Sequence, residues 1–82
     1  MNISGDLAGI VRFHRKKAGL TQAGLAKLAG LGKSAVFDIE RGKTTTQLDT
    51  IGKILGVLNI GVEFTGPLMN ECRRAIAMES NG

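Results

Sequence analysis

Apolar residues recur every three or four positions through the first sixty residues, in segments separated by glycine-containing turns. This spacing is typical of helices that bury one face. It predicts helices over residues 6–18, 22–29 and 33–41, and a fourth that starts after residue 46. The residues expected to face the core are Leu7, Ile10, Val11, His14, Ala18, Leu25, Ala26, Ala29, Val36, Ile39, Leu48, Ile51, Ile54, Leu55 and Leu58.

Capping residues and glycines mark the expected ends of these helices. Ser4 or Asp6 is expected to cap the first helix, and Thr21 immediately precedes the second. Thr46 and Asp49 have the spacing of a capping box at the start of the fourth helix. The glycines expected to end the first three helices are Gly19, Gly30 and Gly42.

The pattern changes after residue 59, where apolar and polar residues alternate. Ile60, Val62 and Phe64 alternate with Gly61, Glu63 and Thr65, which is the period of a strand. A single strand in a helical chain has no partner, and an unpaired strand edge is a liability. We therefore expect this segment to pair with the same segment of a second copy, which makes the protein a homodimer.

These elements predict an all-α fold, with a compact domain of four to five helices plus one C-terminal β-strand that pairs across a dimer. We expect the helical domain to span residues 1–59 and the dimerisation strand to span residues 60–66. Residues 67–82 form a tail that is either a short helix over residues 70–78 or disordered. The 82 residues suffice for one small core.

Basic side chains are concentrated in the first half of the chain. Residues 1–43 carry eight Lys and Arg against three Asp and Glu, whereas residues 44–82 carry three against four. The whole chain has a formal net charge of +4. This distribution favours an anionic partner for the first half.

The sequence offers little for catalysis or for metal binding. Cys72 is the only cysteine, which excludes an internal disulfide and leaves a structural zinc site without ligands. One histidine and scattered carboxylates provide no nucleophile–base pair, so we expect no enzyme activity, cofactor or metal. With no signal pattern and no apolar run near twenty residues, we expect a cytoplasmic protein with no membrane partner.

The stretch AGLGKSA, residues 29–35, contains the Gly-Lys-Ser that ends a nucleotide-binding P-loop. A P-loop also needs a glycine five residues before Gly32, where this chain has Lys27, and it must follow a buried strand. Here a predicted helix precedes it. Two short helices joined by a glycine turn favour a helix-turn-helix, whose second helix can enter the DNA major groove. On pattern and charge alone, a plain helical bundle is the alternative.

The segments LTQAGLAKLAGLGKSAVFDIERGK and TTTQLDTIGKILGVLNI closely resemble the Xre (Cro/phage-repressor) helix-turn-helix family over about residues 7–60. The matching residues are Leu20, Thr21, Gln22, Leu25, Ala26, Gly30, Val36, Ile39, Glu40, Gly42, Leu48, Ile51 and Leu55. The resemblance implies a lambda-repressor-like fold. It also implies a DNA-binding transcriptional repressor that binds palindromic double-stranded operator DNA as a dimer.

The segment NIGVEFTGPL resembles the C-terminal strand of HipB-type antitoxins. That resemblance implies repression of a toxin–antitoxin operon and binding of a HipA-type serine/threonine kinase toxin. It places the protein in a bacterial cytoplasm, associated with the nucleoid. Two alternatives stay open: a stand-alone regulator without a toxin partner, and a protein that mainly binds and restrains the kinase.

The resemblance to the Xre family also implies the residues that contact DNA. The first turn of the third helix would present Lys33 to guanine, and Asp38 would accept a hydrogen bond from cytosine. Phe37 would contact a thymine methyl group or pack against the partner subunit or the first helix. The full set expected to contact DNA is Thr21, Gln22, Lys33, Ser34, Ala35, Phe37, Asp38, Lys43 and Thr44.

The resemblance also bears on four further positions. Arg15 and Glu40 match an ion pair between the first and third helices, read mainly as a brace. Gly24 stands where the family commonly has a glutamate that completes the cap with Thr21, so we expect a less stable second helix. His14 stands where the family usually has an apolar residue, and we expect it to be half-buried.

Overall fold

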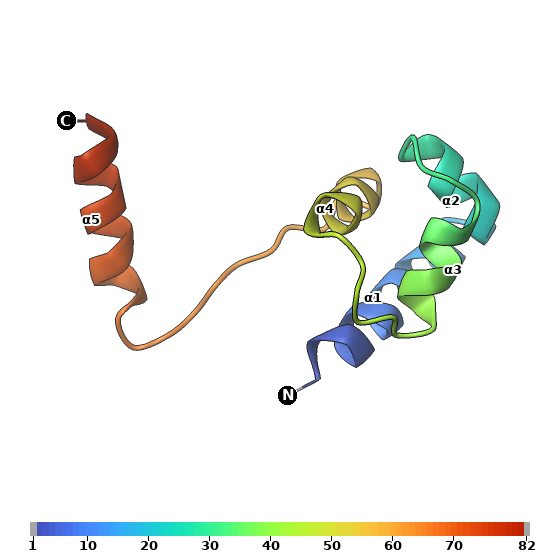
Figure 1. Ribbon diagram of the computed structural model, residues 1–82, viewed down its shortest axis with the longest axis horizontal. Coiled ribbons are helices and arrows are strands. Elements are labelled where there is room, and N and C mark those ends of the chain that lie inside the picture. The colour runs from blue at the N-terminus through green and yellow to red at the C-terminus, as the bar shows by residue number, and fades with distance from the viewer. Residues whose placement is uncertain (1, 82) are drawn as a thin grey trace.

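The computed structural model describes residues 2–81, which form five helices (Figure 1). Their bounds are α1 Ile3–Lys17, α2 Gln22–Leu28, α3 Ser34–Glu40, α4 Leu48–Val57 and α5 Met69–Asn81. The predicted all-α helix-turn-helix domain is confirmed. Within residues 2–81 no β-strand is formed, and residues 1 and 82 of the expected domain ranges lie outside the described residues.

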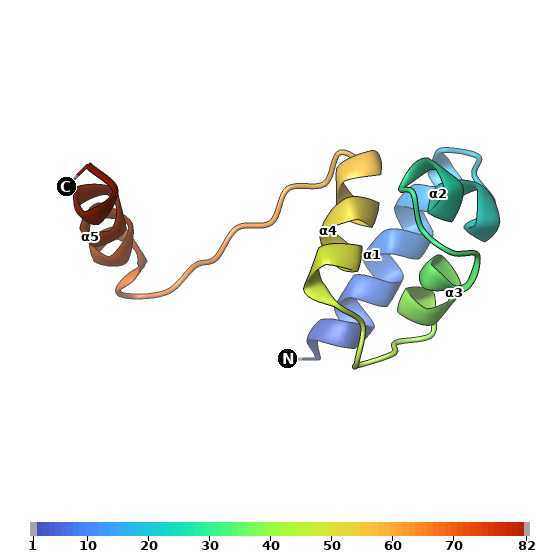
Figure 2. The same cartoon turned by 45° about the horizontal axis from the view of Figure 1, so that its top comes forward.

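Helices α1 to α4 pack into one body, in which α3 contacts α1, α2 and α4, and α2 also contacts α4 (Figure 2). Each of the four contributes fully or nearly fully buried side chains to a single core. The core residues are Val11, Leu25, Ala26, Val36, Ile39, Ile54 and Leu55. All seven belong to the core predicted from the hydrophobic pattern.

Several helix ends follow the expected chemistry. The Thr21 hydroxyl accepts a hydrogen bond from the Gly24 N–H at 2.9 Å and so caps α2. The glycines after α1, α2 and α3 have φ values of +71°, +71° and +81°, a conformation that favours glycine. The cap of α1 was predicted wrongly, because the helix starts at Ile3 and the Asn2 side chain accepts from the Gly5 N–H at 3.0 Å.

The predicted capping box of α4 is also wrong. The helix starts at Leu48 with Gln47 as its N-cap, and no side chain caps it. This start places Thr46 one residue too early to act as the cap. Its hydroxyl donates to the Lys43 carbonyl at 3.5 Å instead, and Asp49 pairs with Lys53 at 3.1 Å.

Four residues expected in the core are exposed. The other helices cover α1 on the side of Val11, so Ile10 and His14 lie at the edge of the contact. His14 Nδ1 is hydrogen-bonded to the Ile10 carbonyl oxygen at 2.7 Å, which corrects the expected half-buried placement. Ala18 follows the last turn of α1, and Leu48, in the first turn of α4, is 83% exposed.

Residues 61–66 lead away from the four-helix body as an extended segment and carry α5 to the far end of the molecule (Figures 1 and 2). Ile60, at its start, is half-buried against the core. Arg73 fixes the segment to α5, because its Nη2 donates to the Phe64 carbonyl at 2.6 Å and lies 3.8 Å from Glu63 Oε1. Of the two expectations for the tail, the helix is the one observed.

Candidate nucleic-acid interface

Helices α2 and α3 are joined by a tight turn that fixes their relative orientation. The Leu31 N–H donates to the Ala26 carbonyl at 2.8 Å, and the Gly30 N–H donates to that of Lys27 at 3.0 Å. Val36 and Ile39 anchor α3 in the core, with 0% and 2% exposure. The opposite side of α3 therefore stays open to solvent.

The open side of α3 carries most residues that the sequence singled out. Lys33, Ser34 and Phe37 are exposed, and Phe37 is 52% exposed. Ala35 and Asp38 are half-buried on the same helix. These five residues therefore lie on the side of α3 that faces away from the core.

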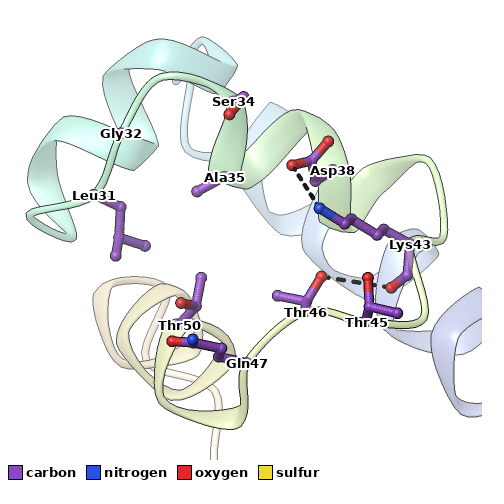
Figure 3. Close-up of a pocket in the computed structure, with 10 residues that line it drawn as sticks. All are labelled: Leu31, Gly32, Ser34, Ala35, Asp38, Lys43, Thr45, Thr46, Gln47 and Thr50. Atoms are coloured by element: carbon purple, nitrogen blue, oxygen red, sulfur yellow. Dashed lines mark hydrogen bonds and ion pairs between the residues drawn. The ribbon is translucent and has the colours of Figure 1, made fainter.

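A polar hollow of about 390 Å³ separates this part of α3 from the start of α4 (Figure 3). Ser34, Ala35 and Asp38 line one side, and the N-cap residue Gln47 and Thr50 of α4 line the other (Figure 3). The remaining lining residues are Leu31, Gly32, Lys43, Thr45 and Thr46. Thr45, Thr46, Gln47 and Thr50 were not assigned to the DNA-binding site from the sequence. The available signal was the run of hydroxyl and amide side chains over residues 44–47.

Asp38 is held by two cations rather than left free. Arg41 Nε donates to its Oδ1 at 3.1 Å, and Lys43 Nζ lies 3.6 Å from its Oδ2 (Figure 3 shows the Lys43 pair). The hydrogen bond from Arg41 is the main cause that lowers the pKa of Asp38; burial opposes it, and the charges of Lys43 and Arg41 add to the lowering. Asp38 is therefore ionised at neutral pH, and it offsets part of the positive charge beside it.

Arg15 of α1 and Glu40 of α3 form the ion pair that the resemblance implied. Arg15 Nε donates to Glu40 Oε2 at 2.6 Å and Nη2 donates to Oε1 at 2.9 Å, with side-chain exposures of 11% and 5%. Arg15 Nη1 also donates to the Leu20 carbonyl at 2.8 Å, and Gln22 Nε2 donates to Glu40 Oε1 at 3.2 Å. One carboxylate thereby ties α1, α2 and α3 together.

These contacts set the protonation of the pair. Burial by itself raises the pKa of Glu40, but hydrogen bonds from Arg15 and Gln22 and the charge of Arg15 outweigh it, so the pKa is lowered. The hydrogen bond to Glu40 raises the pKa of Arg15. Both side chains are charged over the whole physiological pH range, which makes the brace permanent there.

Two arginines that sequence reasoning did not assign to DNA flank this brace. Arg12 and Arg41 line a second hollow, of about 350 Å³, together with Arg15, Gln22, Phe37 and Glu40. The Arg41 guanidinium lies 5.8 Å from the centre of the Phe37 ring, a cation–π distance. The concentration of basic residues in the first half of the sequence was the signal available for them.

The helix-turn-helix family model HTH_3 matches residues 11–64 of the chain. The chain belongs to this Xre-type helix-turn-helix family. The matched range covers all of α2, α3 and α4. Helix α3 is therefore the second helix of the helix-turn-helix, and Gly32-Lys33-Ser34 lies at its start rather than in a nucleotide-binding loop.

Comparisons with individual proteins agree with the family. The chain is 34% identical over 62 residues to the "Uncharacterized HTH-type transcriptional regulator y4mF" of Sinorhizobium fredii (strain NBRC 101917 / NGR234). The alignment covers 76% of this chain and 82% of the relative. It also resembles a solved structure of a chain named MDT Protein, with a TM-score of 0.72 and 27% identity over 82% of this chain and 94% of that one.

The helix-turn-helix family identifies the protein as a DNA-binding transcriptional regulator. Among the described residues, no group of three or more His, Cys, Asp and Glu side chains could hold a metal ion. No helix within residues 2–81 is both long enough and apolar enough to span a membrane.

Proposed function

We propose that this helix-turn-helix protein is a repressor that binds a palindromic operator sequence-specifically as a homodimer. The observation that carries the proposal is the uncovered side of α3, which presents Lys33, Ser34 and Phe37 to solvent beside a polar hollow. An α-helix fits the major groove of B-DNA, where base edges carry a distinct donor and acceptor pattern. We infer that α3 enters that groove.

Within this proposal, three residues of α3 read bases. Lys33 donates to guanine, and Ser34 makes a hydrogen bond to a neighbouring base edge. Asp38 accepts from cytosine N4, which requires it to keep its ionised form and to share its oxygens with Arg41. Ala35 and Phe37 present apolar surface, and contact of Phe37 with a thymine methyl group competes with packing against the partner subunit or α1.

The residues around α3 hold the DNA backbone in register. We infer that Thr21 and Gln22 at the start of α2, and Lys43 and Thr44 after α3, contact the phosphates on either side of the groove. Such contacts fix orientation without reading sequence. Arg12 and Arg41 add positive charge on the same side, so binding is expected to weaken steeply with salt.

The dimer is formed by the extended residues 60–66. Antiparallel pairing centred on Val62 sets Val62 against Val62 and Ile60 against Phe64 on one face. The same register sets Glu63 against Gly61, so that like charges do not face each other. The Arg73 contacts to Glu63 and Phe64 support the proposal, because they hold the segment extended. Two paired copies would read half-sites about 34–36 Å apart or a multiple of that distance.

Footprinting of the purified protein on the DNA upstream of its own gene tests the proposal. We expect two protected half-sites related by a palindrome, with an affinity whose logarithm falls linearly with the logarithm of salt concentration. Protection without a preferred sequence, or an affinity independent of salt, would show that α3 does not read an operator.

We further propose that the protein is the antitoxin of a HipBA-like operon and acts in the cytoplasm beside the nucleoid. The resemblance of residues 59–68 to HipB-type strands supports this role, and DNA binding through α3 leaves exposed apolar side chains such as Leu28 and Leu48 free for a kinase toxin. Co-purification of a HipA-like kinase with the tagged chain is the test. A chain that purifies alone and still represses is the stand-alone regulator.

A further inference from the structure

An apolar groove lies on the side of the body where residues 60–63 leave it. Its apolar lining comes from α1, the end of α4 and the extended segment, and its volume is about 310 Å³. Ile3 is 73% exposed, Ile10 is 43% exposed and Val62 is 67% exposed. The other lining residues are Asp6, Leu7, Leu55, Ile60, Gly61 and Glu63. Within one copy, a contiguous apolar surface of this kind is left in contact with water, which is typical of an interaction site.

Helix α5 and the residue before it present a second uncovered apolar surface. Leu68, Cys72 and Ile76 follow one another at four-residue intervals and so lie on one side of the helix. Leu68 is 70% exposed and Ile76 is 56% exposed, and Cys72 is exposed as well. A thirteen-residue helix without packing is marginal in water, so α5 needs a surface to cover this stripe.

The chain cannot bring its own α5 onto its own groove while residues 61–66 stay extended. The segment starts at the groove and carries α5 away from the body (Figures 1 and 2). Antiparallel pairing with a second copy reverses this geometry. Phe64 of the second copy then lies opposite Ile60, and its chain continues past the end of α4 toward the groove.

We propose that α5 of each copy docks into this groove of the other copy, a helix exchange that rests on the strand-paired dimer proposed above. Met69, the first residue of α5, is five positions after Phe64, and extended chain covers about 3.3 Å per residue. The helix of the second copy therefore starts within about 17 Å of its own Phe64, which lies opposite Ile60. It lies there against Ile3 and Ile10.

Charge sets the orientation of the docked helix. The groove is acidic at its rim, where Asp6 and Glu63 lie. Arg73 follows Cys72 along α5 and borders one edge of the apolar stripe, while Glu71 borders the other. The arginine edge faces Asp6 on the rim, because the reverse orientation would bring Glu71 against that carboxylate, whereas Glu63 is already paired with Arg73 of its own copy.

Cys72, the only cysteine of the chain, makes this arrangement measurable. The variant Ile10→Cys places a second sulfur in the groove, and mild oxidation then links residues that lie close together. We expect a disulfide between residue 10 of one copy and Cys72 of the other, seen as a covalent dimer and identified by mapping the linked peptides. The control is Arg12→Cys, which changes a residue of α1 that lines a different hollow.

The unmodified chain gives a second readout. Solvent access governs cysteine reactivity, so we expect Cys72 of the dimer to be alkylated at least about tenfold more slowly than in urea. Sedimentation of the same sample measures the dimer independently. This keeps the docking of α5 separable from the proposed dimer.

Each other outcome overturns the helix exchange. A link between residue 10 and Cys72 within one chain would place α5 on its own groove. A dimer that gives only Cys72–Cys72 links, or whose Cys72 reacts as fast as in urea, leaves the strand pairing intact but the groove empty. A monomer would remove both the exchange and the dimer on which it rests.

Discussion

Arg15 and Glu40 face each other across the α1–α3 contact, with two hydrogen bonds of 2.6 and 2.9 Å between guanidinium and carboxylate. The pair is far apart in sequence and almost completely buried, with exposures of 11% and 5%. Gln22 completes it by donating to the same carboxylate at 3.2 Å. The angle of α3 is therefore fixed from inside the protein before any DNA is bound.

Replacing the carboxylate measures this brace. Glu40→Gln leaves the Arg15 charge buried without its partner, so we expect the free energy of unfolding in urea at pH 7 to fall by about 2 kcal/mol. The control is Asp49→Asn, whose pair with Lys53 is exposed and contributes less than about 1 kcal/mol. Equal losses in the two variants would mean that the pair does not hold α3.

Acid should weaken the same brace. The pKa of Glu40 is lower in the folded protein than its ordinary value of about 4.3, so the folded state binds fewer protons than the unfolded state between the two values. The stabilisation is complete above about pH 5 and is lost as the pH falls through the folded pKa. Urea titrations from pH 6 to 3 should show the native chain losing stability faster than Glu40→Gln. Parallel curves would contradict the assignment.

Two threonines, of which only Thr21 caps a helix, offer a test of how α2 and α4 begin. Thr21→Ala removes the hydroxyl that accepts from the Gly24 N–H, and we expect a loss of about 1 kcal/mol in thermal or urea unfolding. Thr46→Ala is the matched control, because that hydroxyl caps no helix and bonds only weakly to the Lys43 carbonyl. A larger loss of stability in Thr46→Ala than in Thr21→Ala would mean that Thr46 caps α4 after all.

The difference between these threonines shows what the sequence could specify. The spacing of apolar residues predicted α2, α3 and the seven core residues, because each of these features depends on the local spacing of apolar side chains. The start of α4 differs by one residue from the capping-box register, and local pattern does not resolve such a shift. Similarly, the exposure of Ile10 and His14 depends on which side of α1 the other helices cover.

For the candidate DNA-facing surface, the sequence could predict that residues of α3 are exposed on it, but not which residues lie at its edges. Residues of α3 and the Arg15–Glu40 pair followed from resemblance to the family. The α4 side of the hollow, with Gln47 and Thr50, depends on how two helices meet and has no signature in either segment alone. The ion pairs that hold Asp38 likewise needed the positions of Arg41 and Lys43 in space.

Asp38 is expected to limit binding to unspecific DNA. Asp38→Asn releases Lys43 and Arg41 for phosphates, so we expect tighter binding to a scrambled duplex and a steeper salt slope. The difference in binding free energy between the operator and the scrambled duplex should fall by about 1–3 kcal/mol if Asp38 reads a cytosine. Anisotropy titrations of both duplexes at several salt concentrations measure the two effects. The control is Glu79→Gln, which makes the same charge change on α5. If both variants change DNA binding and its salt dependence equally, Asp38 has no specific role at the DNA.

The dimer prediction depends on the extended segment. Val62→Lys combined with Phe64→Lys places two charges on the apolar face of each paired strand, so sedimentation should show a monomer. Operator affinity should fall steeply, because one half-site then binds without the help of the second. The body should still unfold cooperatively, since Val62 and Phe64 are 67% and 72% exposed in the single chain. A matched variant, Thr65→Lys on the opposite face, should stay dimeric. A double variant that remains dimeric and binds its operator normally would show that residues 60–66 do not join the two copies.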